Sequence, residues 1–347
     1  MTKKDIRTLT LAELRQALAS MDQPAYRAKQ VYDWFWKLGA KNIDEMSNVP
    51  VALREKLKET YTFRSIQLDL RQNSGDGTIK SRYTLHDGYK IETVLIPVVE
   101  DKRATACVSS QVGCSLTCSF CATGRMGRIR NLTAAEIYDQ AFEMDRLSRA
   151  ELGYPLTNIV YMGMGEPLLN YAPVMESIQH ITHADGMAWS PKRITVSTAG
   201  ITKMIRRLGD EQVKFNLALS LHAADDIKRN EIMPINETNH LEALMESLEY
   251  FYKMTHGRIS FEYIALKGFN DTLEDADLLI KLCRRQFPVR VNVIEYNPVE
   301  GAGFKKSDED QVDRFAKRVR DKGIMITVRR SRGKDIDAAC GQLANKA

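Results

Sequence analysis

The 347-residue chain contains no apolar run that approaches the roughly 18 residues needed to cross a bilayer. Its start, from Met1 to Arg7, lacks the apolar core of a signal peptide. Cysteine is scarce, with six residues in all, and without a secretory signal this number argues against a disulfide framework. We therefore expect a cytoplasmic protein with reduced thiols and no membrane association.

Low-complexity segments are also lacking, and 44% apolar residues over this length can build one barrel-sized domain with a smaller appendage. The net charge is only +5, but residues 301–347 hold twelve Lys and Arg against seven Asp and Glu. A basic segment of this kind fits an anionic partner such as RNA, and a solvated charged face explains it equally well.

Three of the six cysteines are closely spaced, because Cys114, Cys118 and Cys121 form a Cys-x3-Cys-x2-Cys run. A structural zinc site takes four nitrogen or sulfur ligands, usually as two separated pairs, and no second pair lies nearby in the sequence. A cubane iron–sulfur cluster normally takes four thiolates, so three leave one iron open to a substrate. The spacing favours such a cluster over zinc or buried structural thiols.

Residues 1 to about 60 predict a small helical domain. Thr10, with Glu13 three positions later, has the pattern of a capping box, and 24–36 carries apolar residues at helical spacing. Aromatic and basic residues interleave here: Tyr26, Arg27, Lys29, Tyr32, Trp34, Trp36 and Lys37. Such a mixture suits RNA, although aromatic side chains are more often part of a core.

From about Phe63 to Pro97 the residues alternate in polarity, and turn-forming segments at 73–77 and 86–88 divide the stretch. This pattern predicts a small antiparallel sheet. Glu92 lies in its last strand beside an apolar run, a position at which a glutamate usually faces solvent.

Beyond Ala104, strands alternate with amphipathic helices, the first of which opens with a capping box between Thr133 and Glu136. Repeated strand–helix units predict a parallel sheet closed, or nearly closed, into a barrel. The pattern leaves open whether the barrel is complete. The expected strands are 104–109, 157–162, 192–197, 213–221, 258–265, 289–295 and 324–329.

Polar or glycine-rich segments follow five of these strands. Barrels place their chemistry at the carboxyl ends of their strands, so the five segments predict a single mouth. Glu166 can accept a hydrogen bond from an ammonium group there, and Ser220 and His222, two apart on a strand, share a face. A histidine at a strand end is otherwise most often structural. The segments are the cysteine loop, Gly163–Pro167, Ser197–Gly200, Ser220–His222 and Asn297–Pro298.

Two further cysteines need separate interpretations. Cys283 lies on an expected amphipathic helix and is best explained as a buried apolar residue. Cys340 lies beyond the last expected strand, and cationic neighbours lower the pKa of a thiol from about 8.5. This favours a reactive nucleophile, with an idle C-terminal cysteine as the alternative. The neighbours are Arg329, Arg330, Arg332 and Lys334.

The cysteine run, followed by Ala-Thr-Gly at 122–124, resembles the radical S-adenosylmethionine (radical SAM) superfamily. Five motifs resemble the RlmN family more narrowly, and together they span almost the whole chain. They are Glu-Thr-Val-Leu-Ile-Pro at 92–97, Cys-Val-Ser-Ser-Gln-Val-Gly-Cys at 107–114, Gly-Met-Gly-Glu-Pro-Leu-Leu-Asn at 163–170, Met-Pro-Ile-Asn at 233–236 and Asp-Ile-Asp-Ala-Ala-Cys-Gly-Gln-Leu at 335–343.

This resemblance implies a partial TIM-like (β/α)6 radical SAM barrel with a small N-terminal helical domain and a short antiparallel β extension. The corresponding segments are 1–62 for the helical, RNA-binding domain, 63–98 for the β extension, 99–300 for the barrel and 301–347 for the basic C-terminal segment. The implied cofactors are S-adenosylmethionine and a [4Fe–4S] cluster on Cys114, Cys118 and Cys121.

The resemblance also implies roles for individual residues. Cys340 takes a methyl group from one S-adenosylmethionine, and the methyl carbon, after losing a hydrogen atom, joins the adenine. Glu92 accepts the C2 proton, and Cys107 attacks Cys340 to release the product, leaving a transient disulfide. A barrel whose first and last strands meet would bring these two cysteines together. Contacts to S-adenosylmethionine fall to Gly165, Glu166, Ser197, Ser220, Leu221, His222 and Asn297.

The implied substrates are C2 of an adenosine in 23S rRNA and of the adenosine beside the anticodon in tRNA. A monomer that takes electrons from flavodoxin or ferredoxin is expected. Three alternatives remain at this point. They are a Cfr-type methyltransferase acting on adenine C8, a radical SAM enzyme of other chemistry, and a non-catalytic RNA-binding protein with a structural cluster.

Overall fold

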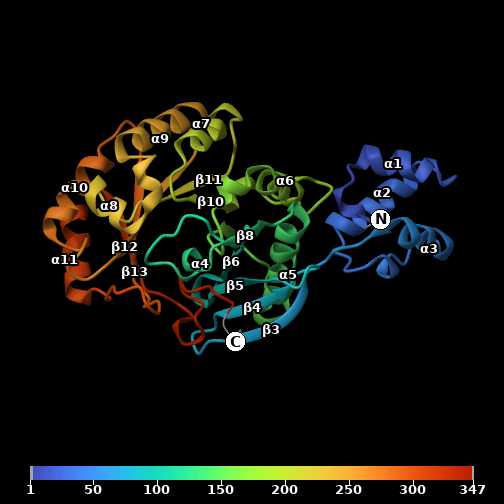
Figure 1. Ribbon diagram of the computed structural model, residues 1–347, viewed down its shortest axis with the longest axis horizontal. Coiled ribbons are helices and arrows are strands. Elements are labelled where there is room, and N and C mark those ends of the chain that lie inside the picture. Colours follow the sequence, from blue (N-terminus) through green and yellow to red (C-terminus); the bar gives the residue numbers. More distant parts are fainter. Residues whose placement is uncertain (1–2, 346–347) are drawn as a thin grey trace.

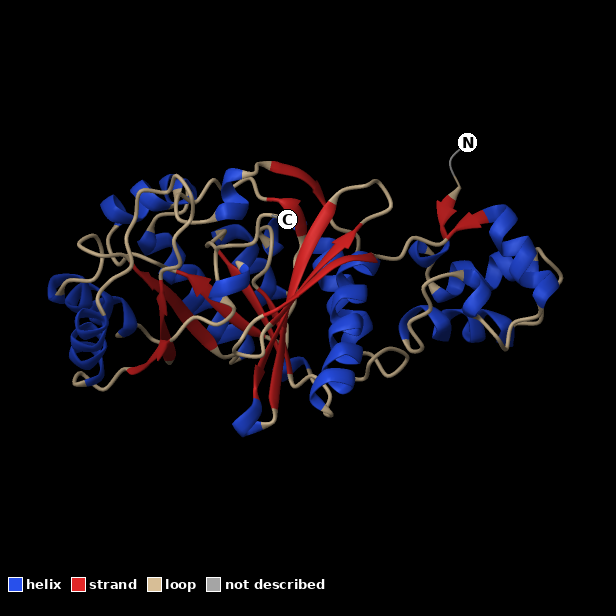
Figure 2. Ribbon diagram, turned by 90° about the horizontal axis from the view of Figure 1, so that it is seen from below, coloured by secondary structure: helices blue, strands red, loops and turns tan. Residues whose placement is uncertain are grey.

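A ten-stranded mixed sheet organises the protein in the computed structural model, which describes residues 3–345. The strands follow the order β14-β13-β12-β11-β10-β9-β6-β5-β4-β3. Figures 1 and 2 show the sheet in the middle of the molecule, with the N-terminal helices at one end and α8 to α11 at the other.

The seven strands predicted beyond residue 104 all form and run parallel to one another. They are β6 (Arg103–Cys107), β9 (Asn158–Tyr161), β10 (Ile194–Thr198), β11 (Asn216–Ser220), β12 (Ile259–Ala265), β13 (Val289–Glu295) and β14 (Met325–Arg329). The helices between them are α5 (Ala134–Leu152), α6 (Tyr171–Thr182), α7 (Thr202–Asp210), α8 (Asp226–Ile232), α9 (Leu241–Thr255), α10 (Leu273–Cys283) and α11 (Glu309–Arg320). Strand–helix units thus build the partial barrel, and β14 adds a final strand.

The predicted antiparallel extension is confirmed and continues the same sheet. Its strands are β3 (Gln67–Asn73), β4 (Ile79–Thr84) and β5 (Lys90–Val98). Strand β5 pairs with β6, so the extension is joined directly to the first barrel strand. The carboxylates of Asp76 and Asp87 accept hydrogen bonds from the backbone two residues later and shape the two turns.

The barrel does not close. Within residues 3–345, β3 and β14 each pair on one side only, so the first barrel strand, β6, does not meet the last. The expectation that closure would bring Cys107 and Cys340 together is therefore wrong. Instead, the segment after β14 runs back to the extension, where Gly333 donates a hydrogen bond to Asp76 and Ser74 donates one to Asp335.

Helix α5 fixes one face of the extension against the barrel. It begins with the expected capping box, in which Thr133 accepts from the backbone N–H of Glu136 and Glu136 accepts from that of Thr133. Its buried Gln140 accepts hydrogen bonds from the Thr93 hydroxyl and the Ser109 backbone. Because side chains alternate along a strand, Glu92 points to the opposite face of β5.

The N-terminal segment folds as predicted into helices α1 (Leu11–Ala19), α2 (Tyr26–Trp36) and α3 (Val51–Thr60), and the Thr10–Glu13 capping box is present. Strands β1 (Lys4–Asp5) and β2 (Tyr61–Thr62) pair its two ends. The ring of the buried Trp36 stacks on His180 of α6 with 3.7 Å between centroids. Of the interleaved aromatic residues, Trp36 is thus core, whereas Tyr26 is 55% exposed.

One buried ion pair ties these helices to the barrel. The guanidinium of Arg7, which is fully buried, contacts the Asp139 carboxylate of α5 at 2.6 Å. Arg7 also lies over the Phe63 ring, with 4.8 Å from its central carbon to the ring centroid. At this junction the charge of Arg7 pairs with Asp139, and its planar guanidinium packs on an aromatic ring.

Replacing Arg7 by Met would leave the buried Asp139 without its cation. We expect a loss of about 3–5 kcal/mol in the free energy of unfolding, measured by urea denaturation at pH 7. Lys58→Met, which removes an exposed ion pair with Asp44 in the same domain, is the control and should leave the midpoint near that of the wild type. Equal midpoints for Arg7→Met and Lys58→Met would contradict this role.

Candidate active site

The three closely spaced cysteines lie on a loop between two short strands. Strands β7 (Gln111–Gly113) and β8 (Arg128–Asn131) form an antiparallel hairpin, and helix α4 (Ala122–Arg125) begins directly after Cys121. Gly113 has a φ of +75°, and a Cβ on it would lie 1.8 Å from the carbonyl oxygen of Gly127. Only glycine therefore allows the two ends of this loop to meet. The sequence analysis missed this hairpin.

The cysteine loop is a poor environment for free thiolates and a good one for a metal cluster. Burial raises the pKa of all three thiols, that of Cys114 to about 11. Negative charge on Cys121 and Cys114 raises the pKa of Cys118 further. Bound iron replaces the thiol proton with positive charge, which removes this penalty. No three His, Cys, Asp or Glu side chains among residues 3–345 are grouped to hold a single metal ion. The donor set fits a cluster, whose thiolates bind different irons.

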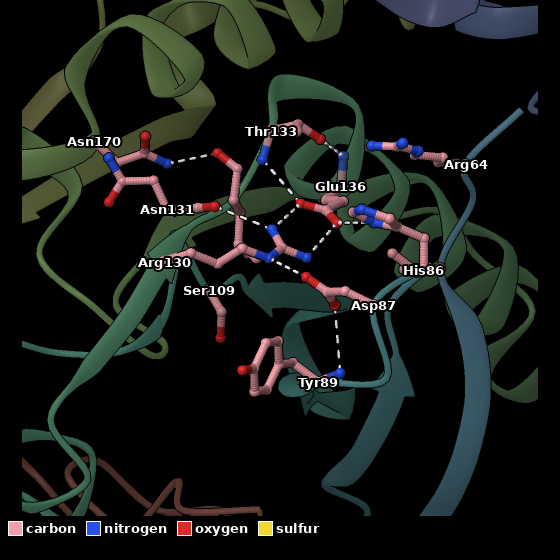
Figure 3. Close-up of polar contacts among 12 residues, drawn as sticks. Arg64, His86, Asp87, Tyr89, Ser109, Arg130, Asn131, Thr133, Glu136 and Asn170 are labelled. Atoms are coloured by element: carbon pink, nitrogen blue, oxygen red, sulfur yellow. Dashed lines mark hydrogen bonds and ion pairs between the residues drawn. The ribbon is translucent and has the colours of Figure 1, made fainter. Parts of the chain in front are cut away.

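Arg130 fastens the cysteine loop to its surroundings (Figure 3). Its guanidinium donates to both oxygens of Glu136 on α5 at 2.8 Å and also binds Asp87 in the turn between β4 and β5. His86 of the same turn lies 3.4 Å from Glu136. One side chain thus joins the loop, the barrel's first helix and the extension.

Gln111 and Asn170 hold the Gly163–Pro167 turn against the cysteine hairpin. The Gln111 side chain accepts from the Glu166 backbone N–H at 2.9 Å and donates to Asn131 at 2.8 Å. Asn170 donates to the Ser110 and Leu132 carbonyls. At Gly165, with a φ of +96°, a Cβ would lie 2.5 Å from the Gln111 Cβ. The glycine is required by this close approach.

Glu166 is the buried carboxylate of the mouth. Its two oxygens accept hydrogen bonds from the backbone N–H groups of Leu168 and Ala199, and burial raises its pKa to about 6. It therefore joins the segments after β9 and β10. The Thr198 side chain is a further hydrogen-bond partner of this carboxylate. A carboxylate has about four acceptor positions, so the expected contact with an ammonium group remains chemically open.

Ser197, Ser220 and His222 lie at the ends of β10 and β11 as expected. The two serine hydroxyls are 3.3 Å apart, and the His222 ring meets the Phe120 ring of the cysteine loop edge-on at 4.7 Å. Burial and the charge of Arg229 lower the pKa of His222 to about 3, and its Nδ1 accepts from the Ile264 backbone. His222 is therefore neutral, and its ring is held in place by the backbone N–H of Ile264.

Arg229 is a buried cation that the sequence analysis missed. It lies on α8, fully buried, and donates to the carbonyls of Leu221, Ala199 and Ser220. It thereby fixes the backbone at the ends of two barrel strands. The Asn297 amide donates to the Ser331 hydroxyl and to the Glu295 carbonyl.

The C-terminal segment crosses the mouth and places Cys340 there. Ala122 donates from its backbone to the Gly341 carbonyl at 2.8 Å, and the Thr123 hydroxyl donates to the Leu343 carbonyl at 2.6 Å. These bonds hold the tail against α4, directly after Cys121. Cys340 retains exposed surface and is close enough to both Cys121 and Cys107 for electrostatic interaction.

The expected lowering of the Cys340 pKa is wrong. Dense packing around the thiol, with Cys121 and Glu262 nearby, raises its pKa to about 11, and of the four expected cations only Arg329 acts to lower it. The other three are engaged elsewhere. Arg330 and Lys334 bind the buried Glu295, and Arg332 donates to the Pro97 carbonyl.

Cys107 and Glu92 lie on one face of the sheet. Cys107 of β6 is paired in register with Val94, two residues from Glu92, and burial and Cys340 raise its pKa to about 12. Both Cys107 and Cys340 are free thiols. Glu92 is 1% exposed, so the usual solvent-facing strand position does not apply. Cys283 is half-buried on α10, in line with the expected packing role.

Glu92 is enclosed by the tail and by a lysine. One of its oxygens accepts from the backbone N–H groups of Ala344 and Asn345, at 2.9 and 3.1 Å. The other lies 3.3 Å from the Lys80 ammonium. A cavity of about 530 Å³ lies elsewhere, at the amino ends of β10 to β14, and does not belong to this mouth.

Comparison with protein-family models matches two segments of the chain. Residues 4–62 match the ribosomal RNA large subunit methyltransferase N-terminal domain, and residues 108–283 match the radical SAM superfamily. None of the helices between residues 3 and 345 combines the length and apolarity of a membrane span.

Curated relatives match along the whole chain. A probable dual-specificity RNA methyltransferase RlmN from Cytophaga hutchinsonii is 52% identical, over 99% of this chain and 93% of the relative. The dual-specificity RNA methyltransferase RlmN of Nautilia profundicola is 40% identical, over 93% and 94% of the two chains. Among solved structures, a radical SAM methyltransferase from Sphaerobacter thermophilus has 40% identity and a TM-score of 0.93, covering 99% of this chain and 100% of that one.

Removing one thiol of the cysteine loop should remove the cluster. In Cys118→Ala, reconstituted without oxygen, we expect the iron content and the visible absorbance of the iron–sulfur cluster to fall close to background. Cys283→Ala, which removes a thiol outside the loop, should keep both signals. A Cys118→Ala protein that holds iron like the wild type would contradict the assignment.

Proposed function

The chain belongs to the RlmN family of radical SAM RNA methyltransferases, and from this we propose how its residues divide the work of methylating an adenosine at C2. The protein uses a [4Fe–4S] cluster and S-adenosylmethionine. When bound, these supply an electron and a carbon radical that abstracts hydrogen. All other steps fall to residues of the mouth.

Cys114, Cys118 and Cys121 hold the cluster in this proposal. Residues at the carboxyl ends of β9 to β13 would hold S-adenosylmethionine. Glu166 accepts from its amino group through the lone pairs that the Leu168 and Ala199 amides leave free. The remaining contacts are made by Gly165, Ser197, Ser220, Leu221, His222 and Asn297.

Cys340 is the methyl carrier. Its sulfur attacks the methyl carbon of one S-adenosylmethionine: the new bond joins the Cys340 sulfur to that carbon, the bond from the carbon to the sulfonium sulfur breaks, S-adenosylhomocysteine leaves, and the thiol proton goes to solvent. The position of Cys340 beside Cys121 supports this role, because a hydrogen atom of its methyl group must then be taken close to the cluster. The resulting carbon bonds to C2 of the adenine and links RNA to the protein.

Glu92 and Cys107 finish the reaction. The Glu92 carboxylate accepts the proton from C2, and the Cys107 sulfur attacks that of Cys340, which breaks its bond to the methylene carbon. The carbon then takes a proton and leaves as the new methyl group. The two electrons released when the two cysteine sulfurs form the disulfide equal the two taken up in the net conversion of S-adenosylmethionine to methionine and 5′-deoxyadenosine. An outside donor is thus needed only to prime the cluster and to reduce the disulfide.

The observation that carries the proposal is the path of the tail across the mouth. The bonds from Ala122 to Gly341 and from Thr123 to Leu343 bring Cys340 to the cysteine loop, and the amides of Ala344 and Asn345 reach Glu92. The proposed methyl carrier, base and resolving thiol thus lie around one space. A structural cluster protein would have no use for this gathering.

The substrates and the remaining partners are part of the same proposal. They are C2 of an adenosine in 23S rRNA and of the adenosine beside the anticodon in tRNA. The helical segment 1–62, with the exposed Tyr26 and Leu38, and the basic segment 301–347 are proposed to contact RNA. Flavodoxin or ferredoxin supplies electrons to a cytoplasmic monomer. Nucleoside mass spectrometry on RNA methylated by the purified enzyme tests this, since 8-methyladenosine in place of 2-methyladenosine would indicate the Cfr-type alternative.

Cys340→Ala should bind the cluster normally and still cleave S-adenosylmethionine slowly, but methylate no RNA, because the methyl carrier is missing. Transfer of label from methyl-labelled S-adenosylmethionine to the protein measures methylation of Cys340, and transfer of label to RNA measures the complete reaction. Cys283→Ala is the matched control and should label normally. Full turnover by Cys340→Ala would remove this residue from the mechanism.

Cys107→Ala should accept the methyl group on Cys340 but fail to release the product, because the resolving thiol is gone. The expected result is a covalent protein–RNA species, seen as a slowly migrating band on a denaturing gel and lost on nuclease digestion. Free methylated RNA at the wild-type rate would count against the role of Cys107.

A further inference from the structure

Lys80 is a buried lysine that the proposed reaction leaves unused. Its side chain is 3% exposed, and its ammonium lies 3.3 Å from Oε1 of Glu92, which is itself 1% exposed. The same ammonium donates a hydrogen bond to the Asp337 carbonyl of the tail at 3.4 Å. A lysine is rarely buried unless it is paired, so this position requires an explanation.

The register of the sheet places Lys80 and Glu92 on one face. Lys80 pairs with Val94 and Arg82 with Glu92, so all four side chains point to the side where the tail lies. The other charged groups there have partners. Arg82 binds Asp69 and the Asn345 carbonyl, and Lys90 binds Asp69. Cys107 of β6 and the tail backbone complete the surroundings of Glu92.

The two oxygens of Glu92 are contacted by different parts of the chain, the tail and strand β4. Oε2 accepts from Ala344 and Asn345, which belong to the tail. Oε1 faces Lys80, which lies on β4 in the middle of a hydrogen-bonded strand pair. Adenine can reach Glu92 only if the tail amides leave it. Lys80 is then the partner that stays, in a site with little water, where an unpaired carboxylate is costly.

We propose that Lys80 is a positioning residue for C2 deprotonation: its ammonium, 3.3 Å from Oε1, keeps the Glu92 carboxylate aimed while the tail is displaced. This rests on the role of Glu92 in the proposed function and goes beyond it. The side-chain contacts of Lys80 are with Glu92 and the Asp337 carbonyl. It acts through Glu92, by charge and by geometry.

The first test follows the fate of the protein–RNA species. Lys80→Met should still methylate Cys340 and form 5′-deoxyadenosine, but resolve the covalent species roughly tenfold more slowly or worse, as expected for an impaired base. Lys80→Arg, which restores the cation, should recover most of the rate. Lys90→Met is the matched control, because it removes a cation of β5 that binds Asp69, and it should resolve normally.

The second test asks whether Lys80 acts through Glu92. Glu92→Gln should trap the same covalent species, and adding Lys80→Met to it should slow resolution no further. If Lys80→Met slows resolution by the same factor in the wild type and in Glu92→Gln, the inference is wrong. The double variant also removes both buried charges together, so it stays folded if Lys80→Met alone does not.

The outcomes distinguish a failure of the Lys80 inference from a failure of the proposed function. If Glu92→Gln traps the covalent species while Lys80→Met resolves it at the wild-type rate, the inference on Lys80 is wrong and the proposed function stands. If Glu92→Gln turns over like the wild type, Glu92 is not the base, and the role of Lys80 fails with it.

Discussion

Two hydrogen bonds between α4 and the tail hold the active site together. They run from Ala122 to Gly341 and from Thr123 to Leu343, and they place the last residues of the chain against the loop that carries the cysteines. Because the barrel sheet is open, strand pairing alone could not bring Cys340 to Cys107. The tail bridges the gap, and its own amides reach Glu92. The chemistry proposed here depends on this path.

Buried charge is the second constraint on the site. Arg229 and Lys80 are cations placed where water is scarce, and each is compensated at close range. Arg229 is satisfied by backbone carbonyls at strand ends, and Lys80 by the Glu92 carboxylate. Such arrangements contribute little net stability but fix geometry, since breaking either one leaves an uncompensated group. The positions of the mouth are thus set by polar contacts as much as by apolar packing.

Sequence patterns predicted the fold well because the signals were local. The capping boxes at Thr10 and Thr133, the alternation of strands and helices, and the polar segments after five strands each depend on nearby residues. The patterns missed the hairpin of β7 and β8, whose strands are too short for alternation to register. They also misjudged the Cys340 pKa, because burial of the thiol raises it and Glu295 binds Arg330 and Lys334, two of the expected cations. Partners distant in sequence cannot be read from spacing.

The link made by Arg130 has a consequence for how the site can move. Through Asp87 and Glu136 it connects the cysteine hairpin to the turn between β4 and β5, and β5 carries Glu92 (Figure 3). In the proposed reaction, the cysteine loop and Glu92 therefore belong to one rigid frame. The part that moves relative to this frame is the chain end that carries Cys340.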